Sequence, residues 1–326
     1  MSNPIKIGIL GCANIAERFV IPAIKESTEL FELIGVASRS SDKAKQFADK
    51  FETNAFTGYQ SLINVDKLQA VYIPLPNSMH YEWIKKALQK NKHVLVEKSL
   101  ACDLDQVEEL NQLAKEKRCI LVENFQFRHH SQLQYIKDLI ASDVIGELRT
   151  IRSSFGFPPF KDEDNIRYSK QLGGGALLDV GAYPLKIVQE LLNEGIYVDS
   201  ASLFMDEKKQ VDIFGSAQLK VKKSPVTAQV AFGFDNFYQC NLELWGAKGY
   251  IKANRIFTAP PGFKPEIEVQ TTQGKTVTLL PEDNHFNNML NHFNRLINQD
   301  CERDSEYQQN INQARLISEL KSKSNA

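Results

Sequence analysis

Short apolar segments alternate with amphipathic segments along the first 122 residues, and this alternation constrains the fold more than any other feature. The apolar segments have the length and β-branched content of buried strands, and they cover residues 5–10, 31–38, 70–75, 93–96 and 119–122. The segments between them space their apolar residues along one helical face, notably over 42–51, 80–89 and 104–116. This alternation predicts an α/β domain in which helices cover both faces of a parallel sheet.

The pattern changes after residue 122. Val226, Ala228 and Val230 begin a run with a period of two, which predicts antiparallel strands with one buried face. The predicted helical segments of this part are 132–142, 175–192 and a final pair within 285–320, followed by a tail, 321–326, that is expected to fray. We therefore predict two domains, residues 1–122 and 123–326, that are packed together rather than tethered by a linker.

Composition excludes several classes of protein. The formal net charge is −1 and no basic stripe is present, so nucleic-acid binding is not expected. No segment approaches the ~20 apolar residues of a membrane-spanning helix, and the amino terminus lacks the pattern of a signal peptide. The 5 cysteines show neither a disulfide framework nor the spacing of a metal site. We expect a cytoplasmic protein without a bound metal.

The turn after the first strand resembles a dinucleotide-binding turn. Gly11, Ala13 and Ala16 take the places of the small residues in a GxGxxG or GxGxxA fingerprint, before a helix that is predicted to end near residue 26. Such a turn presents backbone N–H groups to a pyrophosphate. An ordinary strand–turn–helix is the alternative reading of the motif taken alone. The candidate cofactor contacts in this turn are Gly11, Cys12, Ala13, Asn14 and Ile15.

The end of the second strand indicates which dinucleotide would bind. An acidic residue that accepts hydrogen bonds from the ribose is typical here of NAD-binding proteins, whereas this chain has Arg39 between Ser38 and Ser40. A guanidinium pairs with a phosphate, and Lys43 lies one turn further on. We therefore predict NADP(H) rather than NAD(H), with Arg39 on the 2′-phosphate. A solvated surface arginine is the alternative.

The loop after the third strand is stiffened by prolines, among them Pro74, and lies at the sheet edge where ligands bind in such folds. Leu75, Asn77 and His80 are further candidate cofactor contacts. Asn77 could cap the following helix or touch the cofactor ribose, and capping is the better explanation of its side chain. His80 is more often a packing residue at such a position than a catalyst.

Lys98 is the strongest catalytic candidate, because it follows Glu97 at the carboxyl end of the fourth strand, and Glu97 and Lys98 are also candidate cofactor contacts. Asp179 and Tyr183 lie four residues apart in a predicted helix, so both could face one substrate. Lys98 would stabilise charge on a carbonyl oxygen and Tyr183 would transfer the proton, while Asp179 orients a substrate hydroxyl or Lys98. Taken alone, Lys98 could be an ordinary surface residue and Tyr183 an ordinary core residue.

These motifs together resemble the glucose–fructose oxidoreductase/inositol dehydrogenase (Gfo/Idh/MocA) family. The matching segments are 11–16, 37–40, 72–77, 97–99 and 173–183. The resemblance implies a Rossmann domain followed by an α/β domain with a large open, mostly antiparallel sheet. One face of that sheet commonly serves oligomerisation, which implies a homodimer or homotetramer. Two departures from the family pattern are Ser99 in place of proline and Tyr183 where many members carry histidine.

Within the family, segments 155–159 and 165–168 are similar to nucleotide-sugar 3-ketoreductases. Arg167 and Tyr168 could then bind a diphosphate or stack on a base, or they could be ordinary loop residues. The glycine run 173–175 beside them would let a ligand approach the backbone. The roles of residues 128–130 stay open.

The function that we predict is that of an NADP(H)-dependent oxidoreductase acting on a sugar, with a nucleotide-linked ketosugar as the favoured substrate. A free-sugar or trans-dihydrodiol dehydrogenase is the alternative within enzymes. A non-catalytic regulator that binds the dinucleotide is a further alternative, although it would have no use for Lys98 and Tyr183.

Overall fold

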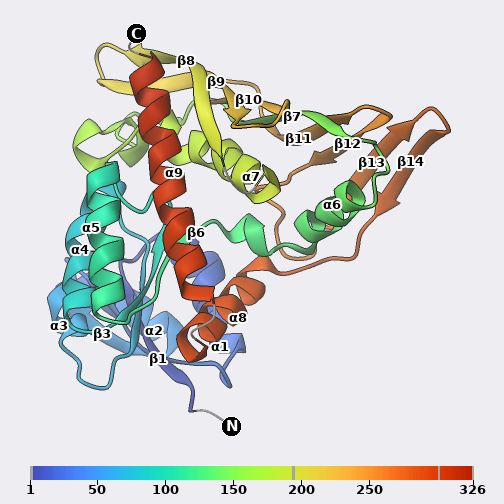
Figure 1. Ribbon diagram of the computed structural model, residues 1–326. Coiled ribbons are helices and arrows are strands. Elements are labelled where there is room, and N and C mark those ends of the chain that lie inside the picture. The colour runs from blue at the N-terminus through green and yellow to red at the C-terminus, as the bar shows by residue number, and fades with distance from the viewer. Residues whose placement is uncertain (1–2, 193–194, 300–301, 325–326) are drawn as a thin grey trace. The chain divides into compact units, whose positions relative to one another are not determined.

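The computed structural model describes residues 3–192, 195–299 and 302–324 (Figure 1). The chain divides into two compact units. The first unit comprises Met1–Asn124 and Phe286–Ala314, and the second comprises Phe125–His285 and Arg315–Ala326. The expected boundary after residue 122 therefore lies close to the observed one. The expectation that all later residues form the second domain differs from the structure, because residues 286–314 belong to the first unit.

A six-stranded parallel sheet forms the centre of the first unit, in the order β3-β2-β1-β4-β5-β6. The strands are β1 (Ile5–Leu10), β2 (Phe31–Ser38), β3 (Asn54–Thr57), β4 (Ala70–Ile73), β5 (His93–Glu97) and β6 (Leu121–Asn124). Ile9 is paired with Val36 on one side and with Tyr72 on the other, so β1 is central and the strand order reverses beside it. Ligands bind at such a reversal, outside the carboxyl ends of the strands.

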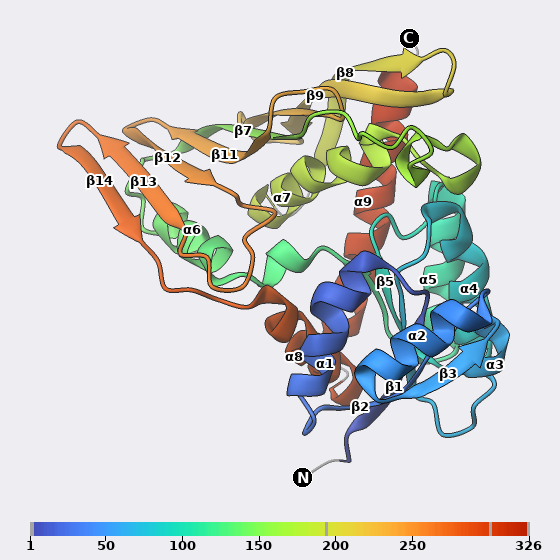
Figure 2. The same ribbon diagram turned by 180° about the vertical axis from the view of Figure 1, so that it is seen from behind.

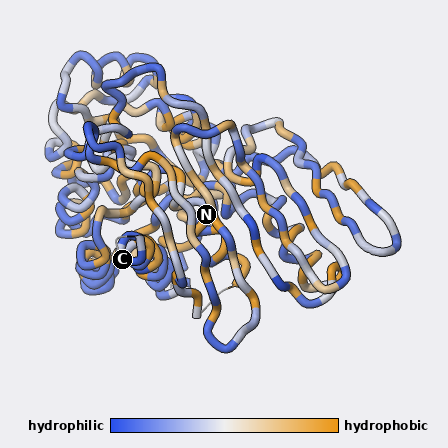
Figure 3. Tube along the Cα trace, turned by 90° about the horizontal axis from the view of Figure 1, so that it is seen from above, coloured by the Kyte–Doolittle hydropathy of each residue, from blue (hydrophilic) through white to orange (hydrophobic). Residues whose placement is uncertain are grey.

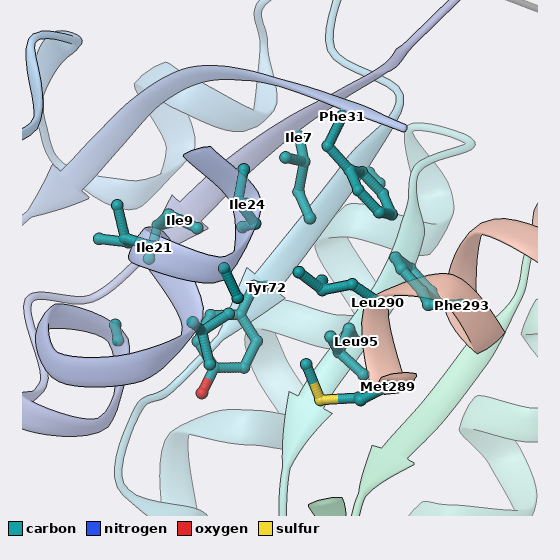
Figure 4. Packing of buried hydrophobic residues seen from close by; sticks show 14 of the residues in the cluster. Ile7, Ile9, Ile21, Ile24, Phe31, Tyr72, Leu95, Met289, Leu290 and Phe293 are labelled. Carbon is teal, nitrogen blue, oxygen red and sulfur yellow. The ribbon is translucent and has the colours of Figure 1, made fainter. Parts of the chain in front are cut away.

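Helices cover both faces of this sheet. They are η1 (Ala16–Val20), α1 (Ile21–Glu26), α2 (Ser41–Phe51), α3 (Tyr59–Ile63), α4 (Asn77–Gln89), α5 (Leu104–Glu116), α8 (His285–Asn298) and the first part of α9 (Arg303–Ser324). One face packs against α1 and α8, where Ile9 and Tyr72 of the sheet lie close to Ile21 and Leu290 (Figure 4). The other face packs against α3, α4 and α5. The sequence did not predict β3 or α3, which are only 4 and 5 residues long.

An eight-stranded sheet forms the second unit, in the order β14-β13-β12-β11-β7-β10-β9-β8. Its strands are β7 (Leu148–Gly156), β8 (Ile196–Asp206), β9 (Val211–Val221), β10 (Thr227–Gly233), β11 (Gln239–Gly246), β12 (Gly249–Asn254), β13 (Glu266–Thr271) and β14 (Gly274–Leu279). The central pair β7 and β10 is parallel and the other pairs are antiparallel. The predicted fold class is confirmed.

One face of the eight-stranded sheet is buried and the other is exposed. Ala228, Val230 and Phe232 are at most 2% exposed, whereas Gln229 between them is exposed. The colours along the strands alternate accordingly (Figure 3). The buried face contacts α7 (Ala182–Leu192) through β7 and β10. The remaining helical segments of this unit are η2 (Gln126–His129), α6 (Ser131–Ala141), η3 (Ile166–Tyr168), η4 (Lys170–Leu172) and η5 (Leu177–Gly181) (Figure 2).

The last helix is longer than predicted. α9 continues to Ser324, so the expectation that residues from 321 onward fray is wrong for 321–324. Within the second unit, Glu319 accepts a hydrogen bond from the Val198 N–H and Arg315 donates one to the Ile196 carbonyl. These contacts hold the end of the helix against β8. No helix of the described residues is long and apolar enough to cross a membrane.

Candidate active site

The turn between β1 and η1 has the geometry of a phosphate-binding turn. Gly11 has φ +127°, and a Cβ atom there would lie 2.8 Å from Leu75 Cδ2, so no other residue fits without strain. Its N–H donates to the Ala37 carbonyl oxygen at 2.9 Å. The helix that follows begins with the bond from the Glu17 N–H to the Ala13 carbonyl. Residues 12–15 are partly or fully exposed, and the first N–H groups of a helix have no partner within the helix, which suits an anion.

Two exposed cations, Arg39 and Lys43, lie just beyond the end of β2. The neighbouring hydroxyls hold the backbone: Ser38 Oγ accepts the Ser40 N–H at 3.2 Å, and Ser40 Oγ accepts the Lys43 N–H at 3.3 Å, which caps α2. Burial raises the pKa of the nearby Cys12 thiol, with smaller opposing effects from Ser38 and Lys43, so Cys12 stays neutral. The residues predicted to bind the pyrophosphate and the 2′-phosphate of the cofactor thus follow the carboxyl ends of β1 and β2.

The loops after β4 and β5 are joined through His80. Its ring is fully buried, with Nδ1 2.8 Å from the Ser99 carbonyl oxygen and Nε2 2.7 Å from that of Leu75. Burial lowers the pKa of His80 to about 4, although the two carbonyls oppose that shift. The neutral ring can donate to only one of them. His80 therefore positions the segment that contains Lys98, and its predicted contact with the cofactor remains a prediction.

Asn77 is the first residue of α4, and Pro74 and Leu75 lie in the loop before it. Pro76 occupies the N-cap position, so Asn77 lies one residue inside the helix, and the capping role of its side chain stays a prediction. The loop contains two prolines, which fix φ near −65° and supply no N–H. The Asn77 side chain is partly exposed, so its alternative role at the cofactor ribose stays a prediction.

Two carboxylates make hydrogen bonds around the end of β5, which Lys98 follows directly. Glu97 Oε1 accepts the Tyr72 hydroxyl at 2.6 Å and the Asn124 amide at 2.7 Å. Glu123 Oε1 accepts the Leu100 N–H at 2.8 Å, on the other side of Lys98. The Glu97 carboxylate therefore links β5 to side chains of β4 and β6. Its contact with the cofactor stays a prediction. Lys98 itself is partly exposed, directly after β5.

Tyr183, at the start of α7 in the second unit, is 8% exposed and surrounded by aromatic rings. The ring centroids of Phe125, Phe127, Phe155 and Phe257 lie 5.4, 5.9, 5.1 and 5.5 Å from its own. The contacts with Phe125 and Phe155 are edge-to-face and those with Phe127 and Phe257 are tilted, and together they fix the orientation of the phenol ring.

Asp179 is paired with Arg167, which the sequence did not predict. Arg167 Nε donates to Asp179 Oδ2 at 2.6 Å. The sequence assigned Asp179 to a substrate hydroxyl or to Lys98, and assigned Arg167 to a diphosphate or a base. Asp179 also lies in a π-helical segment, η5, rather than in the regular helix expected from residue 175. π-helical turns inside helices are frequent at functional sites.

Arg167 and Tyr168 belong to a cluster of cations and aromatic rings. The Arg167 guanidinium lies 5.0 Å from the Phe160 ring centroid, and Lys209 Nζ lies 3.6 Å from that of Tyr168. The Tyr168 hydroxyl accepts the Phe160 N–H at 3.1 Å. We call these four residues the Arg167 cluster. Sequence reasoning missed Lys209, because it lies in a hairpin turn far along the chain and carries no motif.

Two of the residues whose roles stayed open have structural partners. Arg128 Nε donates to Glu190 Oε1 at 2.8 Å, and both side chains are buried. Burial alone would raise the pKa of Glu190, but the charges of Arg128, Lys186 and Lys137 lower it to about 2. His130 Nδ1 accepts the Gln132 N–H and so caps α6.

The family model of oxidoreductases with an NAD-binding Rossmann fold, GFO_IDH_MocA, matches residues 5–125, and the model of the family's C-terminal domain matches 133–252. The chain belongs to the Gfo/Idh/MocA family. The predicted family and its oxidoreductase class are therefore confirmed.

Several relatives within the Gfo/Idh/MocA family are sugar reductases. A dTDP-3,4-didehydro-2,6-dideoxy-alpha-D-glucose 3-reductase from Actinomadura kijaniata is 39% identical over 87% of this chain and 85% of its own. The enzyme of the same name from Saccharopolyspora spinosa is 42% identical over 83% and 80%. A crystal structure of a 3-ketoreductase from Actinomadura kijaniata, in complex with NADP and TDP-benzene, matches with a TM-score of 0.94, 36% identity and 98% of both chains.

Proposed function

We propose that this chain is an NADP(H)-dependent reductase of a nucleotide-linked ketosugar. The similarity to dTDP-sugar 3-reductases over 87% of the chain is the observation that carries this proposal. The exposed Arg39 and Lys43 at the end of β2 suit the 2′-phosphate of NADP, because cations pair with phosphates and cannot accept hydrogen bonds from a ribose. The solved relative also holds NADP.

The residues of the first turn fit a dinucleotide. Gly11 has φ +127° and lies close to Leu75, and residues 12–15 after it are partly or fully exposed, which suits a phosphate that approaches the backbone. When bound, the nicotinamide would supply or accept the hydride. Arg39 would hold the 2′-phosphate and the turn would hold the pyrophosphate.

Lys98 and Tyr183 would carry out the acid–base chemistry of the reaction. Lys98 would stabilise the negative charge that develops on the carbonyl oxygen of the sugar. Tyr183 would donate its phenolic proton to that oxygen in reduction and remove it in oxidation. A cation close to Tyr183 would favour the phenolate, because an opposite charge stabilises the charged form.

The Arg167 cluster would bind the nucleotide part of the substrate. Arg167 and Lys209 supply positive charge suited to a diphosphate, and Tyr168 and Phe160 supply rings suited to a base. Asp179 already accepts from Arg167, so the guanidinium is held in place before a substrate binds. Asp179 would then face the sugar with its remaining acceptor capacity.

NADPH consumption with paired substrates tests this function. The free and dTDP-linked forms of the same ketosugar would be compared, and we expect turnover with the linked form and a KM at least about tenfold higher for the free form. A D-xylose 1-dehydrogenase (NADP(+)) from Haloferax volcanii is 31% identical over 83% of this chain, which makes oxidation of a free sugar the second candidate. Turnover confined to free sugars would reject the nucleotide-linked substrate in favour of that candidate.

We further propose that the exposed face of the eight-stranded sheet joins copies of this chain into a homodimer or homotetramer. This face carries large apolar side chains, of which Trp245 is 49% and Phe204 54% exposed. It also carries a row of ion pairs, from Arg152 through Glu243 to Lys252. Exposed apolar groups among paired charges are typical of interfaces.

Sedimentation velocity tests this interface. We expect the wild-type chain to sediment as a dimer or tetramer and Trp245→Glu as a smaller species, because a carboxylate would be buried without a partner. Lys45→Glu on α2, in the other unit, is the control. A monomeric wild-type protein would reject the proposal.

A further inference from the structure

Asp212, the second residue of β9, contacts the helical segment that carries Asp179 and Tyr183. Its Oδ2 accepts the Leu177 N–H at 2.5 Å, and the Ala176 N–H also donates to this carboxylate. These N–H groups belong to the start of η5, where a helix has no carbonyls of its own to accept them. A carboxylate also favours the positive end of the helix dipole. Asp212 therefore holds this helical start from a separate strand.

The glycine run fits around the Asp212 carboxylate. Gly175 has φ +112°, and a Cβ atom there would lie 2.3 Å from Asp212 Oδ1. A Cβ atom on Gly174 would lie 2.4 Å from the Arg167 carbonyl oxygen, which accepts the Gly175 N–H at 2.9 Å. The sequence suggested that these glycines admit a ligand. The structure instead places a carboxylate and a backbone carbonyl against them.

The contacts continue from Asp212 to the proposed catalytic residues. The Gly175 carbonyl accepts the Asp179 N–H at 3.2 Å, and the Asp179 carboxylate accepts from Arg167. η5 then runs directly into α7, which begins one residue before Tyr183. A shift of the helical start would displace both Asp179 and Tyr183, and small displacements of reacting groups are costly.

We propose that Asp212 is a positioning residue, whose carboxylate fixes the start of η5 and thereby the placement of Asp179 and Tyr183 on the substrate. This inference rests on the role proposed for Tyr183. Burial raises the pKa of Asp212, while the N–H groups of Leu177 and Ala176 and the charge of Lys321 oppose that shift. Burial of this carboxylate therefore costs free energy, and that cost agrees with a specific structural role for Asp212.

The test compares three variants of the full-length enzyme. Asp212→Ala removes both acceptor oxygens, and Asp212→Asn keeps the shape and one acceptor. Asp206→Asn is the matched control, because Asp206 ends the other strand of the same hairpin, and asparagine keeps the Oδ1 that accepts the N–H groups of Lys208 and Lys209, so the turn that carries Lys209 is preserved. We expect kcat to fall by about tenfold or more in Asp212→Ala and by less in Asp212→Asn, with NADPH affinity unchanged. Asp206→Asn should stay within about twofold of the wild type.

A double variant separates this inference from the proposed function. If Asp212 acts through Tyr183, Asp212→Ala should lower kcat much less in a Tyr183→Phe background than in the wild type. Tyr183→Phe with wild-type kcat would instead overturn the role of Tyr183. Normal kcat in Asp212→Ala, or a fully additive loss in the double variant, would overturn the role of Asp212.

Hydrogen exchange gives a readout that does not depend on turnover. Amide exchange in residues 175–185 should accelerate in Asp212→Asn and not in Asp206→Asn, because only the first variant weakens the cap of η5. If Asp212→Ala does not fold, Asp212→Asn still tests the inference by this measurement. Equal exchange in the two asparagine variants would overturn it.

Discussion

Lys98 and Tyr183 make the sharpest predictions at the scale of single residues. Lys98→Met removes the positive charge that stabilises the carbonyl oxygen, and Tyr183→Phe removes only the hydroxyl that transfers the proton. We expect each to lower kcat by about 10²-fold or more, with NADPH binding retained. Steady-state kinetics and a fluorescence titration with NADPH measure the two effects. Losses of less than tenfold in both variants would contradict the mechanism.

Arg39 makes a prediction about the cofactor. Arg39→Ala should raise the KM for NADPH by about tenfold or more and leave that for NADH unchanged, because only NADPH carries the 2′-phosphate. Lys45→Ala is the control, since Lys45 is also an exposed cation near this strand end but one that has no predicted role. Equal KM values for NADPH before and after Arg39→Ala would show that Arg39 is an ordinary surface residue.

At the scale of elements, α8 completes the core of the first unit from far along the chain. Leu290 is fully buried among Ile7, Tyr72 and Leu95 of the sheet (Figure 4). Leu290→Ala should lower the free energy of unfolding by about 2–5 kcal/mol, because it leaves a cavity in a packed core. Urea unfolding measures this effect. The neighbouring Asn291→Ala, at an exposed position, should cost less than about 0.5 kcal/mol.

Elements with strong periodicity were predictable and those that depend on distant partners were not. β2 and α5 have the predicted ends at Phe31–Ser38 and Leu104–Glu116, because apolar spacing and local chemistry decide them. β3 is too short and too exposed to carry such a pattern. The position of α8 depends on tertiary contacts with residues more than 200 positions away, which no local pattern reports.

The same distinction holds for the candidate site. The glycine turn, Arg39, Lys98 and Tyr183 could be proposed from the sequence because their residue types suit the chemistry and lie at strand or helix ends, and their roles stay predictions. Arg167 pairing with Asp179, and Asp212 lying under Gly175, were not predictable, because each depends on the path of a loop. The glycine run was predicted to let a ligand approach the backbone, but the close neighbour of Gly175 is the carboxylate of Asp212.

For the whole molecule, histidines whose pKa is lowered by burial predict sensitivity to mild acid. Burial lowers the pKa of His80 and His93 to about 4 and that of His285 to about 3, whereas an unfolded histidine has a pKa of ~6.5. As pH falls below ~6.5 the unfolded state takes up protons first, so stability present at neutral pH is lost progressively towards pH 4.

Urea unfolding at pH 7.5, 6 and 5 measures this loss, and this window lies above the range where most carboxylates titrate. We expect the free energy of unfolding to decrease steadily across the series. His93→Gln should reduce the slope of this dependence on pH, because it removes one titrating group. Glutamine can still accept the Ile120 N–H that His93 Nδ1 accepts at 3.0 Å, so the fold is retained. A flat dependence between pH 7.5 and 5 would contradict the prediction.

The parallel pairing of β7 with β10 has a consequence for how such a protein can change its substrate. Parallel neighbours cannot be joined by a hairpin, so the chain leaves the middle of the sheet at residue 157 and returns beside the same strand at 227. Arg167, Asp179, Tyr183 and Asp212 all lie on the chain between these two strands, which also forms β8 and β9 at the edge of the same sheet. A recombination event that exchanged only this stretch, with its two edge strands, would deliver a new sugar preference complete with its own support, while the parallel pairing of β7 with β10 kept its register.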